Sequence, residues 1–234
     1  MDRAHRLELK HDKFVEQVGH TVEYASEHRK QLIRYGAIGL AVVVVALGVY
    51  LYMQSQASAR QDALRVAIRT QEAQIGQPGT EFLIGFKTQQ EKDAAVQKTW
   101  QDLASKYPGT AEGLVAEYYL GINAADKGNL AEAEKHLKLV ADSGKSDYAS
   151  QAKLTLSDIY AAGGRQAEAE KLLRSLIDDP TIMVSKEEAT LKLGQLLAKS
   201  NPAEARKILE PLRTSRSAVS RAAINALSAL PPAK

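Results

Sequence analysis

The chain has 234 residues, of which 44% are hydrophobic, 25% charged and only 6% aromatic. This composition is typical of a folded, helix-rich protein, and a net charge of +3 gives no reason to expect nucleic acid as a partner. The lack of cysteine excludes disulfides, thiolate metal sites and a cysteine nucleophile.

Residues 1–34 are predicted to be an amphipathic cytoplasmic segment. Apolar residues recur in it at helical spacing, and they are Phe14, Val18, Val22 and Ala25. Such a helix either lies at the lipid headgroups or dimerises, or it docks a cytoplasmic partner. The histidines of this segment are not spaced as metal ligands on one helix face, so we expect neither a metal nor a cofactor.

An uncharged segment follows from Tyr35 to Ala59, and its apolar centre runs from Gly36 to Met53. At about 1.5 Å per residue, this centre is long enough to cross the hydrocarbon core of a bilayer. We therefore predict a transmembrane helix in contact with lipid at residues 35–57. A cleaved signal peptide is the alternative, because small residues follow the apolar run at 57–59. The long segment before the span argues against cleavage.

Residues 58–92 are predicted to be a helical extension of the span followed by a linker. The stretch 58–75 has a helical pattern, whereas glycines and a proline interrupt 76–90. Phe82, Ile84 and Phe86 alternate within the linker. We expect them to pack against the next helix, and a short extended segment is the alternative.

One eight-residue pattern occurs three times in residues 93–230. The copies begin at Leu130, Gln166 and Pro202, a constant offset of 36 residues, and a turn sequence precedes each copy. A period in the mid-thirties with two helices per unit indicates a helical solenoid. An earlier unit is predicted to end at residues 107–109, with Trp100 and Leu103 in its core.

The repeated residue types resemble the tetratricopeptide repeat, whose unit has about 34 residues. The pairs Leu120-Gly121 and Leu193-Gly194 match the apolar–glycine pair of that family's first helix. The small position of its second helix is matched by Ala133, Ala169 and Ala205. The unit is longer here, and the tryptophan of the first helix is missing. The predicted fold is all-α, with an N-terminal single transmembrane helix followed by a tetratricopeptide-repeat-like helical solenoid.

The whole layout resembles the ancillary subunit of the bacterial SecYEG translocon. Basic residues flank the span equally, so the positive-inside rule decides little by itself. The resemblance implies an inner-membrane protein with a cytoplasmic N-terminus and periplasmic repeats. It implies translocon subunits, periplasmic chaperones or exported polypeptides as partners. A cell-division and envelope coordinator of the same repeat class is the alternative, and self-association into a homo-oligomer is left open.

The sequence has none of the common catalytic motifs. A glycine-rich phosphate loop, a serine elbow and a histidine-rich metal motif are all missing, so we expect a binding protein and not an enzyme. His136 is expected to be solvated. The acids that recur near the start of each second helix are expected to be capping charges, and they are Glu132, Glu134, Glu168 and Glu170.

A solenoid of this class binds its ligands on the concave face, which the first helices line. The repeat pattern places six residues there: Tyr118, Ile122, Leu154, Asp158, Leu191 and Gln195. The Lys and Asn residues with which some tetratricopeptide domains clamp a terminal carboxylate are missing from the first copy. An apolar, mildly polar lining suits a helix or an extended segment instead.

Overall fold

The computed structural model describes residues 29–76, 84–144, 147–215 and 218–231. The chain divides into two compact units, Met1–Ser58 and Ala59–Lys234. The described residues are helical apart from connections and one pair of two-residue strands, which confirms the prediction of a helical protein.

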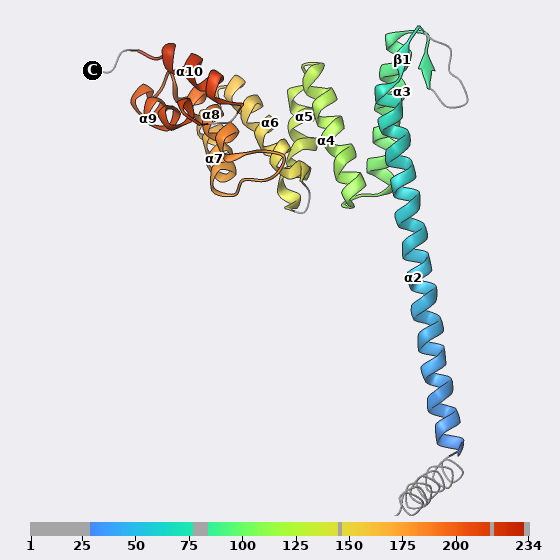
Figure 1. Cartoon of the computed structure of the whole chain (residues 1–234). Helices are drawn as coiled ribbons and strands as arrows, with labels where there is room; N and C mark the ends of the chain where they lie inside the picture. Colours follow the sequence, from blue (N-terminus) through green and yellow to red (C-terminus); the bar gives the residue numbers. More distant parts are fainter. Residues whose placement is uncertain (1–28, 77–83, 145–146, 216–217, 232–234) are drawn as a thin grey trace, which may run out of the picture. The chain divides into compact units, whose positions relative to one another are not determined.

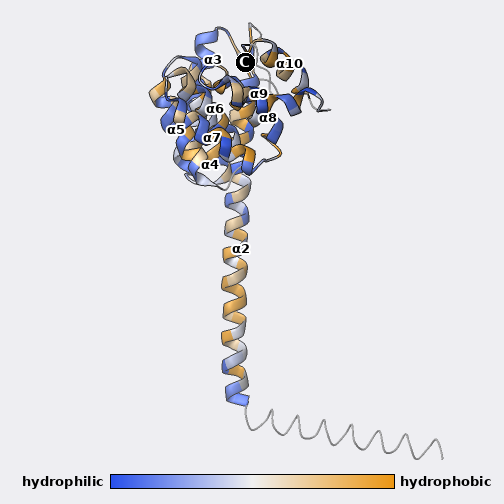
Figure 2. Cartoon of the chain, turned by 90° about the vertical axis from the view of Figure 1, so that its left-hand side faces the viewer, coloured by the Kyte–Doolittle hydropathy of each residue, from blue (hydrophilic) through white to orange (hydrophobic). Residues whose placement is uncertain are grey.

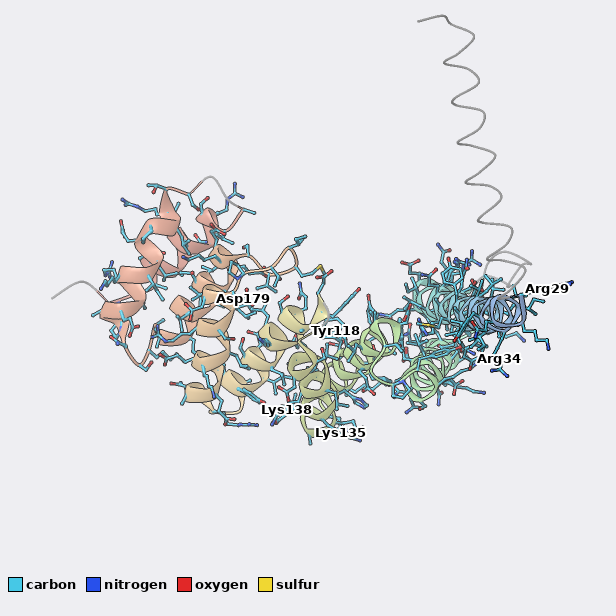
Figure 3. The ribbon with its side chains drawn as sticks, turned by 90° about the horizontal axis from the view of Figure 1, so that it is seen from below. Arg29, Arg34, Tyr118, Lys135, Lys138 and Asp179 are labelled. Carbon is cyan, nitrogen blue, oxygen red and sulfur yellow. The ribbon has the colours of Figure 1, made fainter. Side chains whose placement is uncertain are left out.

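Helix α2 runs from Arg29 to Glu72 and carries the predicted span. Its apolar part is exposed all round, and Figure 2 shows hydrophobic colour along this part of the helix. In Figure 3 the side chains of Arg29 and Arg34 extend outward from the start of the helix. By length and composition, α2 can cross a membrane or serve as a signal sequence.

The second unit begins with the end of α2 and helix α3, Gln89–Lys106. Trp100 and Leu103 are 0% and 2% exposed and pack in one core cluster with Ala67 of α2, as predicted. Between the helices, β1 (Gln74–Ile75) pairs in parallel with β2 (Gly85–Phe86). Phe86 therefore lies in a short extended segment, which was the alternative, and this strand also contacts α3 as expected. Phe82 lies outside the described residues.

Three helix pairs follow, and a single helix comes after them. The pairs are α4 (Ala111–Asp126) with α5 (Leu130–Ser143), α6 (Tyr148–Ala162) with α7 (Gln166–Asp178), and α8 (Lys186–Leu197) with α9 (Pro202–Arg213). The last helix is α10, Ser220–Ser228. Each helix packs mainly on its neighbours in chain order (Figure 1), which is the arrangement of a solenoid.

The repeated eight-residue pattern starts each second helix at its first residue. Gly128 and Gly164 have φ values of +77° and +76° in the turns before α5 and α7, a conformation that glycine adopts without strain. The side chains of Asn129 and Asn201 cap α5 and α9 by accepting hydrogen bonds from backbone N–H groups. The period of 36 residues is therefore the distance between equivalent turns.

The apolar–glycine pairs mark the closest approach of the two helices in a unit. A Cβ atom on Gly121 would lie 2.6 Å from Cγ of Leu137, and one on Gly194 would lie 2.5 Å from Cγ of Leu209. Both leucines are completely buried. The middle unit has Ser157 instead, and its hydroxyl donates to the carbonyl of Leu154 at 2.6 Å.

Ala169→Leu is expected to destabilise the chain by about 1–3 kcal/mol, because extra carbons overpack a filled interior. Ala169 is 0% exposed and packs in the same cluster as Leu137 and Leu156. Thermal unfolding of the full chain in detergent measures the effect. Ala167→Leu is the matched control, since Ala167 is exposed on the same helix. Equal melting temperatures for Ala169→Leu and the parent would contradict the predicted register.

Candidate functional site

The six predicted groove residues lie on the first helices α4, α6 and α8, but they differ in accessibility. Tyr118 and Ile122 are half-buried on α4, and Asp158 and Gln195 are exposed. Leu154 and Leu191 are only 7% and 9% exposed, and both belong to the interior cluster around α8 and α9. These two leucines therefore offer little surface to a ligand.

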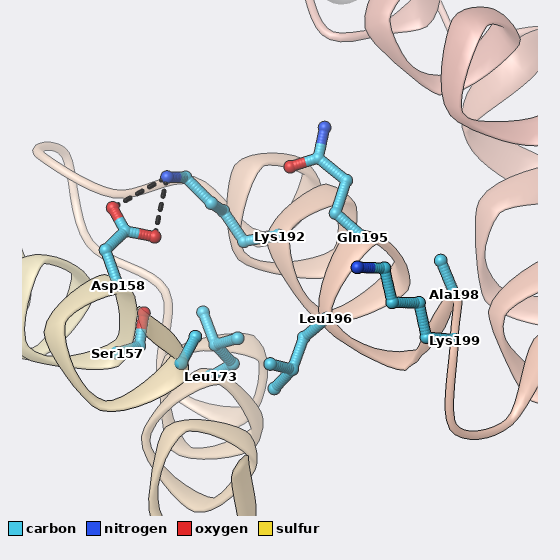
Figure 4. Close-up of a pocket in the computed structure, with 9 residues that line it drawn as sticks. Ser157, Asp158, Leu173, Lys192, Gln195, Leu196, Ala198 and Lys199 are labelled. Atoms are coloured by element: carbon cyan, nitrogen blue, oxygen red, sulfur yellow. Dashed lines mark hydrogen bonds and ion pairs between the residues drawn. The ribbon is translucent and has the colours of Figure 1, made fainter. Parts of the chain in front are cut away.

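Asp158 and Gln195 line a common cavity of about 340 Å³ between α6 and α8 (Figure 4). Its polar side chains include Lys192, whose Nζ donates to both carboxylate oxygens of Asp158 at 2.8 and 2.7 Å. The apolar part of the lining includes Leu173 and Leu196. The cavity can thus accept an apolar group beside polar ones.

The repeat pattern did not single out the two lysines of this cavity, Lys192 and Lys199. Lys192 precedes Gln195 by three residues on α8, a spacing that places two side chains on one helix face. That spacing is a signal from which Lys192 could have been found. Lys199 lies just beyond the end of α8 at Leu197, so helix periodicity alone does not place it in the cavity.

Four aromatic side chains from three helices form a second feature, which we call the aromatic cluster: Trp100 on α3, Tyr118 and Tyr119 on α4, and Tyr148 on α6. The rings of Trp100 and Tyr119 stack with centroids 4.5 Å apart. The centroids of Tyr118 and Tyr148 are 5.0 Å apart, and those of Tyr118 and Tyr119 are 5.6 Å apart. Ring pairs at such distances are mutually stabilising.

The tyrosines of the aromatic cluster present partly exposed, uncharged rings. Burial raises the pKa of the Tyr118 and Tyr119 hydroxyls above their ordinary value, so both phenols stay neutral at physiological pH. Tyr118, Tyr119 and Tyr148 are half-buried. Such rings can cover an apolar side chain and offer a hydroxyl to a backbone group at the same time. Of these residues, sequence reasoning placed only Tyr118 at the binding surface.

The expectation that His136 is solvated is wrong. Its side chain is 15% exposed and lies between two carboxylates, Glu117 of α4 and Glu132 of α5. Nε2 of His136 is 3.0 Å from Glu132, whereas Nδ1 faces Glu117. The residue therefore links the two helices of its unit, a contact that sequence spacing does not reveal.

The recurring acids also connect successive units, which goes beyond the capping role expected of them. Arg165 donates to Glu134 at 2.6 Å, and Arg174 contacts both Glu170 and Glu204 at 2.7 Å. The hydrogen bond from Arg165 lowers the pKa of the Glu134 carboxyl. A lowered folded-state pKa contributes stability near neutral pH that is lost on acidification.

Two lysines of α5 pair with these acids: Lys135 with Glu132 at 3.4 Å and Lys138 with Glu134 at 3.5 Å. Figure 3 shows Lys135 and Lys138 at the edge of the molecule opposite to Tyr118. Their side chains are 66% and 53% exposed. In the part of the chain that the structure describes, no group of three or more His, Asp or Glu side chains is placed to hold a metal ion.

The paired helices define a helical-repeat protein. A family model for the tetratricopeptide repeat-like domain matches residues 29–207, and the chain therefore belongs to that family. The match begins at the first described residue of α2 and ends within α9. No curated protein and no solved structure gives a significant match to the chain. Domains of this family are protein-interaction scaffolds, and their fold is typically non-catalytic.

Proposed function

We propose that the chain is a membrane-anchored scaffold of the bacterial inner membrane and an ancillary subunit of the SecYEG translocon. In this role α2 contacts the translocon within the membrane, and the repeats bind periplasmic chaperones or exported polypeptides. The observation that carries the proposal is the family match, which includes both the apolar helix and the repeats.

The proposed layout assigns residues 1–34 to the cytoplasm, 35–57 to the membrane and 58–234 to the periplasm, with the repeats in residues 93–230. The apolar, exposed surface of α2 supports the membrane assignment. Arg29, Lys30 and Arg34 form the denser basic cluster next to the span, and such a cluster favours the cytoplasmic side.

The proposed binding surface combines the aromatic cluster with the cavity between α6 and α8. Its uncharged rings gain affinity by burying apolar area, at about 25 cal/mol per Å² before the cost of ordering the ligand. An extended polypeptide should therefore bind the aromatic cluster weakly, and salt should change this part of the affinity only a little, because the rings carry no charge. Leu154 and Leu191 are unsuitable for testing this surface, because a charge at either position would be buried in the core.

Crosslinking in intact membranes tests both contacts. A photo-crosslinking residue at Val43 should capture translocon subunits, and one at Tyr118 should capture exported chains or their chaperones. Capture of division or cell-wall factors at both positions would contradict the translocon role. It would support the alternative role as a division and envelope coordinator.

The double variant Tyr118→Ala and Tyr148→Ala is expected to reduce capture of exported chains about tenfold, because two rings of the binding surface are lost. Crosslinking at Ile122, quantified by mass spectrometry, measures the change. Leu139→Ala is the matched control, since Leu139 is 53% exposed on α5. Undiminished capture by the folded double variant would remove the aromatic cluster from the binding surface.

A further inference from the structure

The connection between α7 and α8 presents an aliphatic side chain directly to solvent. Ile182 is 100% exposed, and its neighbour Met183 is 37% exposed. We call residues 181–184 the apolar loop. Residues 180–185 carry no charge, so hydration of a charged group does not account for the exposure of this segment.

The apolar loop is held in one conformation by its own contacts. The N–H of Thr181 donates to the carbonyl of Val184 at 2.9 Å, and the N–H of Val184 donates to Oγ1 of Thr181 at 3.1 Å. The side chain of Val184 is completely buried in the cluster around α8 and α9. Ile182 and Met183 thus lie between two fixed residues.

Two polar residues of α6 fasten the apolar loop from the other side. The hydroxyls of Ser150 and Thr181 are 2.8 Å apart, and Nε2 of Gln151 donates to the carbonyl of Met183 at 2.9 Å. Ser150 is only 5% exposed. Both residues lie within three positions of Tyr148, so the apolar loop and the aromatic cluster meet the same end of α6.

The length of this connection is not needed to join two helices. The equivalent connection between α5 and α6 comprises residues 144–147, whereas the one between α7 and α8 comprises 179–185. The longer connection places Ile182 where no described residue covers it. A rigid, exposed apolar side chain is suited to binding, because little conformational entropy is lost when a ligand covers it.

We propose that the apolar loop is a second contact for the polypeptide ligand. An extended polypeptide that lies on the aromatic cluster covers Ile182 and Met183 with one of its bulky apolar side chains. This inference rests on the proposed function, since it names further residues of the same binding surface and the type of segment bound.

An extended chain suits this surface better than a folded partner does. A stable interface between folded proteins buries at least about 1,000 Å², and a loop of four residues supplies a small part of that area. An extended segment needs only separate contacts for a few of its side chains. The lack of charge on the apolar loop selects segments with aliphatic or aromatic residues.

The test measures binding of a synthetic, unstructured peptide in which Leu alternates with Ser to the full-length chain in detergent. Ile182→Ser is expected to weaken binding about tenfold, because a buried isoleucine is lost from the complex. The melting temperature should stay unchanged, since Ile182 has no buried surface to lose. Ile224→Ser is the matched control, because Ile224 is 47% exposed on α10 and should leave the affinity unchanged.

A second variant tests whether the fixed conformation matters. Thr181→Val keeps the size of the side chain but removes the hydroxyl that contacts Ser150 and Val184. It should weaken peptide binding by a smaller factor than Ile182→Ser does. An all-Ser version of the peptide should bind neither the parent nor the variants.

The possible failures point to different conclusions. If the double variant of Tyr118 and Tyr148 loses the peptide while Ile182→Ser binds it normally, the apolar loop is not part of the site and the proposed function stands. If all variants bind like the parent, the proposed binding surface itself is wrong. If Ile182→Ser changes only the molecular mass in light scattering, the apolar loop joins copies of the chain and the inference is overturned.

Discussion

The double variant Val43→Arg and Val45→Arg is expected to leave the membrane fraction. Both residues lie in the exposed apolar part of α2. Each arginine at the centre of a span costs about 2.5–3.5 kcal/mol on an insertion scale, so the two together cost about 5–7 kcal/mol. Washing membranes with alkaline carbonate and measuring the released protein checks the expectation.

Val66→Arg is the matched control for this experiment. Val66 is also exposed, at 49%, but it lies in the part of α2 that belongs to the second unit. This variant should stay in the membrane. Full retention of the double variant would show that residues 35–57 do not anchor the chain.

Protease added to cells with a permeabilised outer layer should remove the repeats and spare residues 1–34. Complete protection of residues 60–234 would reverse the proposed orientation. Recovery of a soluble chain that begins near Arg60 would show that α2 is cleaved as part of a signal peptide.

The second large effect is expected inside the last helix pair, where Gly194→Val should lower the free energy of unfolding by about 3 kcal/mol. A Cβ atom at this position would meet Cγ and both methyl carbons of Leu209 within 2.9 Å. Leu209 is completely buried, so its side chain has no free space into which it could move.

A double-mutant cycle separates this contact from other effects of the substitution. Leu209→Ala alone should cost about 2–5 kcal/mol, because it leaves a cavity. Combined with Gly194→Val it should cost less than the sum, with a coupling of about 0.5–3 kcal/mol. Ser157→Ala is the control at the equivalent position, where a Cβ atom is already present, and it should cost about 1 kcal/mol at most. Additive costs would mean that the two residues do not touch.

The repeat boundaries were predictable because local residues determine them. Gly128 and Gly164 supply the left-handed turns, and Asn129 and Asn201 cap the helices that follow. Such signals act within a few residues of the chain. The start of each second helix could therefore be read without knowledge of its neighbours.

Accessibility on the first helices was not predictable in the same way. The repeat pattern assigned Leu154 and Asp158 to the same face, yet one is buried and the other exposed. How deep a side chain lies depends on what the next unit places over it, and the residues of α8 are more than twenty positions away. Ion pairs between units, such as Glu134 with Arg165, could not be predicted from local patterns either, because their partners lie in different units.

The parallel strand pair and the apolar loop show a related limit. The two strands pair residues 74–75 with 85–86. The alternation around Phe86 indicates an extended segment there, but no local pattern identifies its partner strand at residues 74–75. Ile182 and Met183 look in the sequence like a fragment of a buried element. The contacts of the apolar loop with Ser150 and Gln151 of α6, which are distant in the sequence, help to hold these side chains toward solvent.

The mainly sequential packing of α3 to α10 has a consequence for how the protein folds during synthesis. Because each helix contacts mainly those next to it in the chain, an emerging polypeptide can assemble one hairpin before the following one has been delivered. Contacts between residues close in sequence also form quickly. Each new hairpin packs on the folded unit before it. During synthesis, the unpacked surface of the array is therefore at its growing C-terminal end. Synthesis and folding can thus proceed in the same direction, from the first unit to α10.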